Sequence, residues 1–122
     1  MSARVIHFQP ENEYWFREGC HILEVANHPE DPQVSIARAR LEPGTHTRWH
    51  ALRDTWERYL IVQGKGIVEI GDLEPSAVGP GDVVRIPAGI RQRIANSGDK
   101  DLIFYAICSP RFTPDCYQSM DD

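Results

Sequence analysis

Short apolar segments separated by glycine, proline, asparagine and aspartate dominate the chain. No stretch repeats apolar residues at the helical period over the length of a helix. Period-two alternation predicts strands over residues 21–26, 33–41, 57–63, 66–71, 82–86, 91–95 and 102–108, with a further strand over 47–52 and a weaker one before Pro10. Several short strands at regular spacing are typical of an all-β sandwich or barrel.

The breaks between these segments support the same fold class. Residues 28–32, 64–66, 79–82 and 96–99 supply positive φ, fixed φ or side chains that cap their own turn, so they predict hairpins and corners. The sequence shows no linker or internal repeat, and 122 residues suit one hydrophobic core. We therefore expect a single domain over residues 1–122.

Charge and composition exclude several function classes. Thirteen Lys and Arg against eighteen Asp and Glu are scattered along the chain, which argues against a nucleic-acid partner. No long apolar run predicts a membrane span, and the first ten residues lack the pattern of a signal peptide, so the expectation is a cytoplasmic protein. Cys20, Cys108 and Cys116 lie far apart and read as free thiols.

The segment 57–63 carries the first candidate for chemistry. Alternation places Glu57, Tyr59 and Ile61 on one face and Leu60 and Val62 on the other, so both faces hold apolar residues and the strand is expected to be covered twice. An enclosed carboxylate costs several kcal/mol unless it is paired or bound. Glu57 is therefore expected to have a partner inside the protein.

Two spaced motifs carry a resemblance to a known family. In residues 44–64, Gly44, His50, Glu57 and Gly64 fall in the positions of the first motif of the cupin superfamily, and Leu52 stands where that motif has its second histidine. In residues 81–96, Gly81, Pro87, Gly89 and Asn96 fit the second cupin motif, and Gln92 stands in the place of its histidine. The chain thus resembles the small single-domain cupins that are described as mannose-6-phosphate isomerase-like.

The resemblance implies a jelly-roll β-barrel of six to eight strands, commonly dimeric, with a divalent metal at its mouth. The family holds iron, manganese, nickel or zinc with three histidines and one glutamate, and this chain keeps His50 and Glu57 of those four ligands. Leucine offers no donor and a glutamine amide oxygen is a weak, neutral one. His50, Glu57 and Gln92 with waters would make an open three-ligand site of reduced affinity.

Two further residues are candidates for ligand contact. His46 and Arg48 are expected to share a strand face with His50 and Leu52, but four residues along a strand separate Cα atoms by roughly 13 Å. A direct share of one ion would be strained, so His46 and Arg48 are interpreted as rim residues that meet an anionic group.

Each candidate also has a structural interpretation. His50 and Glu57 can satisfy each other by a hydrogen bond without a metal, and Gln92 can complete that polar network. Tyr59 is a candidate for ligand contact and equally a core residue.

Two function classes follow, and both take a small-molecule ligand. The first is a metal-dependent isomerase, lyase or dioxygenase acting on a small polar or sugar-like molecule, with Glu57 or His50 moving a proton. The second is a non-catalytic binding barrel without metal, in which His46, Arg48, His50, Glu57 and Gln92 recognise the ligand by hydrogen bonds. A homodimer is expected in either case, because strands apolar on both faces need a cover.

Overall fold

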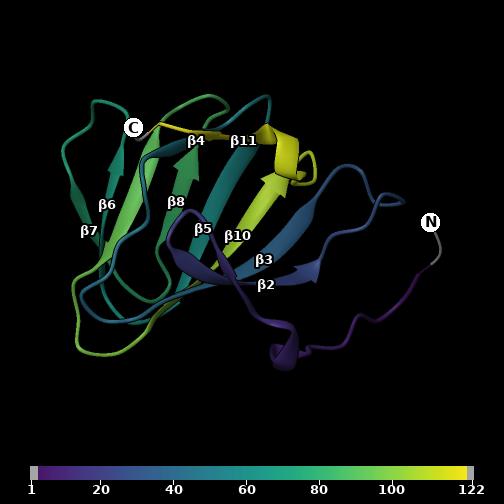
Figure 1. Cartoon of the computed structure of the whole chain (residues 1–122), viewed down its shortest axis with the longest axis horizontal. Helices are drawn as coiled ribbons and strands as arrows, with labels where there is room; N and C mark the ends of the chain where they lie inside the picture. The colour runs from purple at the N-terminus through teal and green to yellow at the C-terminus, as the bar shows by residue number, and fades with distance from the viewer. Residues whose placement is uncertain (1–2, 121–122) are drawn as a thin grey trace.

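The computed structural model describes residues 3–120 and contains two antiparallel sheets (Figure 1). The six-stranded sheet consists, in spatial order, of β1 (Tyr14–Phe16), β2 (Cys20–Ala26), β3 (Ser35–Leu41), β10 (Leu102–Ser109), β5 (Trp56–Gln63) and β8 (Val83–Ile86). The five-stranded sheet consists of β11 (Tyr117–Ser119), β4 (His50–Leu52), β9 (Gln92–Asn96), β6 (Gly66–Ile70) and β7 (Ser76–Val78). The predicted all-β class is confirmed.

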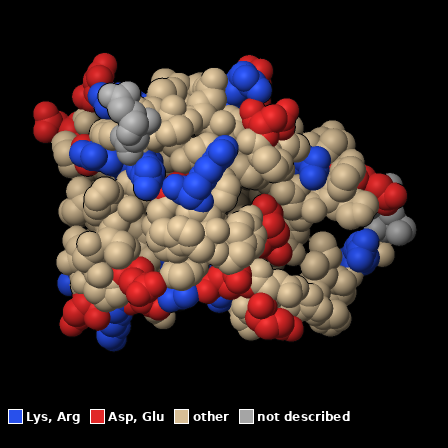
Figure 2. All heavy atoms as spheres, viewed as in Figure 1, with Lys and Arg blue, Asp and Glu red and all other residues tan. Residues whose placement is uncertain are grey.

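Helical structure in residues 3–120 amounts to two single 3-10 turns, Pro10–Asn12 and Pro114–Cys116. Neither turn has the length or the apolar character that a helix needs to cross a bilayer. In the view of Figure 2, basic and acidic side chains are interspersed among uncharged residues, so this face carries no continuous stripe of one sign.

Strand β10 shows how alternation builds the core. Leu102, Phe104, Ala106 and Cys108 are buried, whereas the residues between them are half-buried on the outer face. The antiparallel register sets Phe104 opposite Ile61 and Ala106 opposite Tyr59 on β5. These inward side chains therefore pack as one layer of the core.

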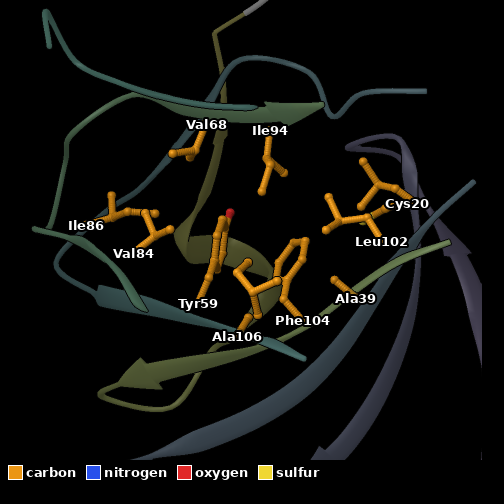
Figure 3. Close-up of a cluster of buried hydrophobic side chains, with 12 residues drawn as sticks. Cys20, Ala39, Tyr59, Val68, Val84, Ile86, Ile94, Leu102, Phe104 and Ala106 are labelled. Carbon is orange, nitrogen blue, oxygen red and sulfur yellow. The ribbon is translucent and has the colours of Figure 1, made fainter. Parts of the chain in front are cut away.

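The second layer of the core comes from the opposite sheet. Val68 of β6 and Ile94 of β9 are paired in register and point toward Tyr59 and Phe104 (Figure 3). The rings of Tyr59 and Phe104 are tilted against each other with centroids 4.3 Å apart. Burying the large side chains of such a layer stabilises the fold by about 1.5–3 kcal/mol each.

Asn96 and Gly64, two motif positions that are not candidates for catalysis or metal binding, have structural roles. Asn96 is buried, and its Nδ2 donates to the backbone oxygens of Leu41 and Lys100, at 2.9 and 2.8 Å. These hydrogen bonds connect β9 to the end of β3 and to the loop before β10. Gly64 has φ +86°, and a Cβ there would lie 2.7 Å from the Asp101 carbonyl oxygen. Only glycine satisfies both conditions, so this corner requires it.

Several expected boundaries are wrong. Residues 3–9 form no strand, and residues 1–2 lie outside the described part of the chain, whereas β1, β7 and β11 are three-residue strands that the pattern did not predict. The N-terminal segment is fixed by charge instead, because Glu13 pairs with Arg38 at 3.1 Å and with Arg40 at 2.7 Å.

The strand expected over 47–52 runs only from His50 to Leu52. The backbone N–H of Arg48 donates to the Glu18 carbonyl oxygen at 2.6 Å, whereas residues 45–47 keep backbone hydrogen bonds to β9, so the ladder is interrupted between Thr47 and His50. His46 makes only an isolated bridge with Ala95. The expectation that His46, Arg48, His50 and Leu52 share one strand face is therefore wrong.

The double cover expected for β5 is also absent within residues 3–120. Its inner residues Glu57, Tyr59 and Ile61 are buried, but Leu60 and Val62 on the outer face are 37% and 43% exposed. The neighbouring Val83 on β8 is 63% exposed and pairs in register with Leu60. The outer face of the six-stranded sheet is thus apolar and open.

Candidate functional site

A pocket lies on the inner face of the six-stranded sheet and is called the inner pocket here. Its volume is about 40 Å³, enough for a compact chemical group or a few waters. Its walls come from β1, β2, β3, β5 and β10, from the turn between β1 and β2, and from the segment after β10. The lining residues are Tyr14, Phe16, Glu18, Ile22, Glu24, Ser35, Ala37, Ala39, Glu57, Tyr59, Phe104, Ala106, Cys108 and Phe112.

Glu57 supplies the buried carboxyl group of the inner pocket. Strand β5 turns it inward, and the register of β5 with β10 sets it opposite Cys108. Glu57 Oε1 accepts a hydrogen bond from Gln92 Nε2 at 2.8 Å, whereas Oε2 has the Cys108 thiol at 3.8 Å. Burial, reinforced by the negative charge of Glu18, raises the pKa of Glu57 from 4.5 to about 7, against the opposing effects of His50 and Gln92.

Gln92 orients Glu57 from the opposite sheet. Strand β9 points it inward, where it is buried, and its Oε1 accepts a hydrogen bond from the Tyr59 hydroxyl. The Tyr59 hydroxyl points from β5 toward the five-stranded sheet (Figure 3), which makes this contact between sheets. Because the amide nitrogen donates to Glu57 and the amide oxygen accepts from Tyr59, both ends of the Gln92 amide have partners.

His50 is buried on β4 and lies opposite Gln92 in register. Its Nδ1 donates to the Arg48 carbonyl oxygen at 2.7 Å, because a carbonyl can only accept. The other ring nitrogen, Nε2, lies 3.8 Å from Glu18 Oε1. The ring stacks on Tyr117 with centroids 5.2 Å apart, so its plane is fixed.

Glu18 is a site residue that the sequence did not reveal. It lies in the turn between β1 and β2 and lines the inner pocket, with its Oε2 accepting a contact from the Cys20 thiol at 3.4 Å. Gly19 allows this turn to approach the neighbouring segment, because it has φ +109° and a Cβ there would lie 2.9 Å from the His46 carbonyl oxygen. A glycine after a glutamate is too common a pattern to predict this contact.

The structure brings together His50, Glu57, Gln92 and Tyr59, but it leaves His46 outside the group. His46 is exposed and lines a separate shallow hollow with Glu69 and Arg93. The Arg48 side chain is also exposed, and its backbone serves as the anchor of Glu18 and His50. Leu52 is buried in a second apolar cluster with Cys108, Cys116 and Tyr117.

The donor set does not fit the metal site that the family implies. Leu52 offers no donor, and the Gln92 amide oxygen is already engaged by Tyr59. Residues 3–120 contain no group of three or more His, Cys, Asp or Glu side chains placed to hold a metal ion. A divalent ion would have to break the hydrogen bonds of Gln92 to gain a weak neutral ligand.

The two buried thiols beside the carboxylates are chemically quiet. Cys20 and Cys108 are free, as expected from the sequence, and both are buried. Burial raises the pKa of each thiol, and the charge of Glu18 for Cys20 and of Glu57 for Cys108 adds to the effect. Both therefore stay protonated and unreactive at neutral pH.

The arrangement is suited to moving a proton. A carboxyl group whose pKa lies near neutrality donates and accepts a proton at physiological pH with equal ease. The Gln92 amide donates to the Glu57 carboxyl group, and the Tyr59 hydroxyl in turn donates to that amide. The orientation of the carboxyl group is therefore set before a ligand enters.

Comparisons with known proteins place this chain in a family. The family model for the cupin domain matches residues 37–108, which is more than half of the chain. The glucose-6-phosphate isomerase of Pyrococcus horikoshii is 31% identical over 98 residues, and the match covers 70% of this chain. This chain spans about half of that relative, 52% of its length.

Two solved structures show the same fold at low sequence identity. The Lactobacillus farciminis oxalate decarboxylase, solved as a formate complex, has a TM-score of 0.75 at 23% identity, covering 88% of this chain and 33% of that one. A Streptomyces nucleoside dehydratase, solved with uridine, has a TM-score of 0.78 at 15% identity, covering 97% and 92%. With the matching family model and the cupin fold of its neighbours, the chain belongs to the cupin family.

Proposed function

We propose that this protein is an isomerase or lyase that transfers a proton on a small polar molecule bound in the inner pocket, with Glu57 as the acid–base group. The observation that carries the proposal is the Glu57 carboxyl, buried in a pocket wall, oriented by Gln92 and poised with a pKa of about 7.

The proposed step balances without a metal. Ionised Glu57 takes a proton from a carbon next to a carbonyl, and the electron pair moves onto the carbonyl oxygen. When the deprotonated carbon carries a hydroxyl group, the proton of that hydroxyl passes to the former carbonyl oxygen, and return of the first proton from Glu57 to the former carbonyl carbon completes an isomerisation. When the next carbon along carries a leaving group, the carbonyl re-forms as that group departs, which completes an elimination.

The relatives fit this range of chemistry. One is named an isomerase and another a dehydratase, and both names describe reactions that shift a proton and an electron pair within a small molecule. The metal-dependent form of the same activity is the less favoured candidate, because the amide of Gln92 is occupied and Leu52 offers no donor. A binding barrel without catalysis is the alternative that the experiment must separate.

Proton transfer is detected most directly by isotope exchange. The protein is incubated in deuterium oxide, with and without chelator, together with glucose, glucosamine, glucuronate or glucose 6-phosphate, and deuterium at the carbon next to the carbonyl is followed by NMR. We expect exchange with at least one compound, and Glu57→Gln should slow it by about 10²–10⁴-fold. Glu74→Gln, an exposed glutamate away from the pocket, is the matched control and should exchange at the normal rate.

Three results would overturn the proposal. Exchange that Glu57→Gln does not affect would remove Glu57 from the step, and exchange abolished by the chelator would return the activity to a metal. Absence of exchange with every compound, together with a ligand that raises the melting temperature in chelator, would favour the binding barrel.

A further inference from the structure

The inner pocket carries charge of one sign. Three carboxyl groups line it, those of Glu18, Glu24 and Glu57, and its lining contains no Lys, Arg or His side chain. This contrasts with the mixed charge of the outer surface seen in Figure 2. An anionic group placed in this pocket would face three carboxyls without a basic partner on the wall.

The carboxylates of the mouth are poorly compensated by the protein. Glu18 Oε1 has the His50 ring at 3.8 Å and Oε2 has a thiol, which is a weak donor. Glu24 Oε2 accepts from Asn27 Nδ2 at a long 3.3 Å, and burial raises its pKa in spite of the nearby Arg111. Arg111 itself is held by Asn27 Oδ1 at 2.8 Å and does not line the pocket. These carboxylates therefore retain capacity to accept donors from a ligand.

The buried Glu57 carboxyl group, at the inner end of the pocket, also lacks a strong hydrogen-bond donor at one of its oxygens. Glu57 is 8% exposed, and its Oε2 has no partner except the Cys108 thiol at 3.8 Å among the described residues. A buried carboxyl oxygen without a strong donor is costly. A ligand N–H directed at this oxygen would remove that cost.

Three aromatic rings also line the pocket, and one of them, that of Phe16, already has the Arg17 guanidinium 5.9 Å from its centroid. Tyr14, Phe16 and Phe112 line the pocket, and the rings of Phe16 and Phe112 meet edge to face with centroids 6.3 Å apart. The negative face of an aromatic ring attracts a cation, most strongly where the cation has lost water. Carboxylates and rings in one small pocket therefore favour the same kind of group.

We infer that the inner pocket recognises an ammonium group, so that the ligand or substrate is a small organic amine and not a phosphorylated or carboxylated molecule. The inference rests on the proposed function only in taking the inner pocket as the working site. It replaces the anionic ligand group that His46 and Arg48 suggested from sequence, because the structure leaves His46 outside this pocket. The compact volume of about 40 Å³ suits the amine end of the molecule.

Three probes of similar size test the charge preference directly. Ethanolamine is a cation, ethylene glycol is neutral and glycolate is an anion at neutral pH, and each is titrated into the ¹⁵N-labelled protein with chelator present. We expect shifts of the amide signals of β1 and β2, and a dissociation constant for ethanolamine at least about tenfold below those of the other two, as for a desolvated cation beside carboxylates and rings.

Variants of the wall identify which groups act. Glu18→Gln and Glu24→Gln should each weaken ethanolamine about fivefold and leave ethylene glycol unchanged, because only a charge is removed. Phe112→Leu keeps an apolar wall and leaves the Arg17 contact on Phe16 in place, and it should weaken ethanolamine about threefold. Glu74→Gln is the control outside the pocket. The amide spectrum of each variant shows that it is folded.

The outcomes separate this inference from the proposed reaction. Ethylene glycol or glycolate binding as tightly as ethanolamine would overturn the amine preference, as would an unchanged constant in both Glu variants. Selective binding of ethanolamine without deuterium exchange in any amine supports the inference and removes the reaction. Exchange confined to glucose 6-phosphate would support the reaction and refute the amine preference.

Discussion

Replacing Glu57 with glutamine should change the pH dependence of stability in a direction fixed by the burial of this carboxyl group. The substitution keeps the size and the oxygen that accepts from Gln92 Nε2, and it removes the ionisation. In the folded protein the pKa of Glu57 is raised from 4.5 to about 7, so the native state holds a proton that the unfolded state has released. Stability of the natural protein must therefore fall as pH rises through this window.

The magnitude follows from the size of the shift. Each pKa unit corresponds to about 1.4 kcal/mol, so a shift from 4.5 to about 7 costs the natural protein about 3 kcal/mol above pH 7. Below pH 4.5 the carboxyl is protonated in both states and the cost is absent. Glu57→Gln should thus match the natural protein near pH 4 and exceed its free energy of unfolding by about 3 kcal/mol at pH 8.5.

Urea unfolding of both proteins at half-unit steps of pH measures this difference. Titrations of all other groups cancel in the comparison, because they are common to the two proteins. A difference that grows between pH 4.5 and 7 and then stays constant is the expected result. A difference that is flat across the range would refute the burial of an ionisable Glu57, and one that falls with pH would show that the carboxylate is stabilised by a cation.

Two further outcomes are expected. Tyr59→Phe removes the hydroxyl that donates to Gln92 and should lower the free energy of unfolding by about 1–3 kcal/mol. Tyr105→Phe on the outer face should change it by less than about 0.5 kcal/mol. Equal effects of the two substitutions in chemical denaturation would contradict the hydrogen-bond network of Tyr59, Gln92 and Glu57. A second copy of the chain is expected to cover the open outer face of the six-stranded sheet, so light scattering should report a dimer. Leu60→Glu should convert this dimer to a monomer, whereas Leu73→Glu, in an exposed turn, should leave it intact. A natural protein that is monomeric would refute this cover.

The sequence predicts those parts of the fold that depend on alternation and on fixed turns. Strand β10 has the clearest period and its boundaries are nearly right, because every second residue is buried. Strands β1, β7 and β11 have three residues each, too few to show a period, and pairing with neighbours far along the chain defines them.

The candidate site divides in the same way. Motif spacing identifies His50, Glu57 and Gln92, because each occupies a motif position within a strand. Glu18 is invisible in the sequence, since a turn between two weak strands places it on the pocket through the contact of Arg48 N–H with its carbonyl oxygen. His46 and Arg48 are exposed and lie outside the inner pocket, because the strand expected over 47–52 begins only at His50 and the alternation does not extend back to them.

We propose that this cupin transfers a proton with Glu57 and without a resident metal. Elemental analysis of the protein purified without a histidine tag tests it most directly, with Leu52→His combined with Gln92→His as the variant that restores the family's ligand set. The account predicts no stoichiometric metal in the natural protein and bound metal in the restored variant. Near-stoichiometric metal in the natural protein, lost in both His50→Ala and Glu57→Gln, would contradict it.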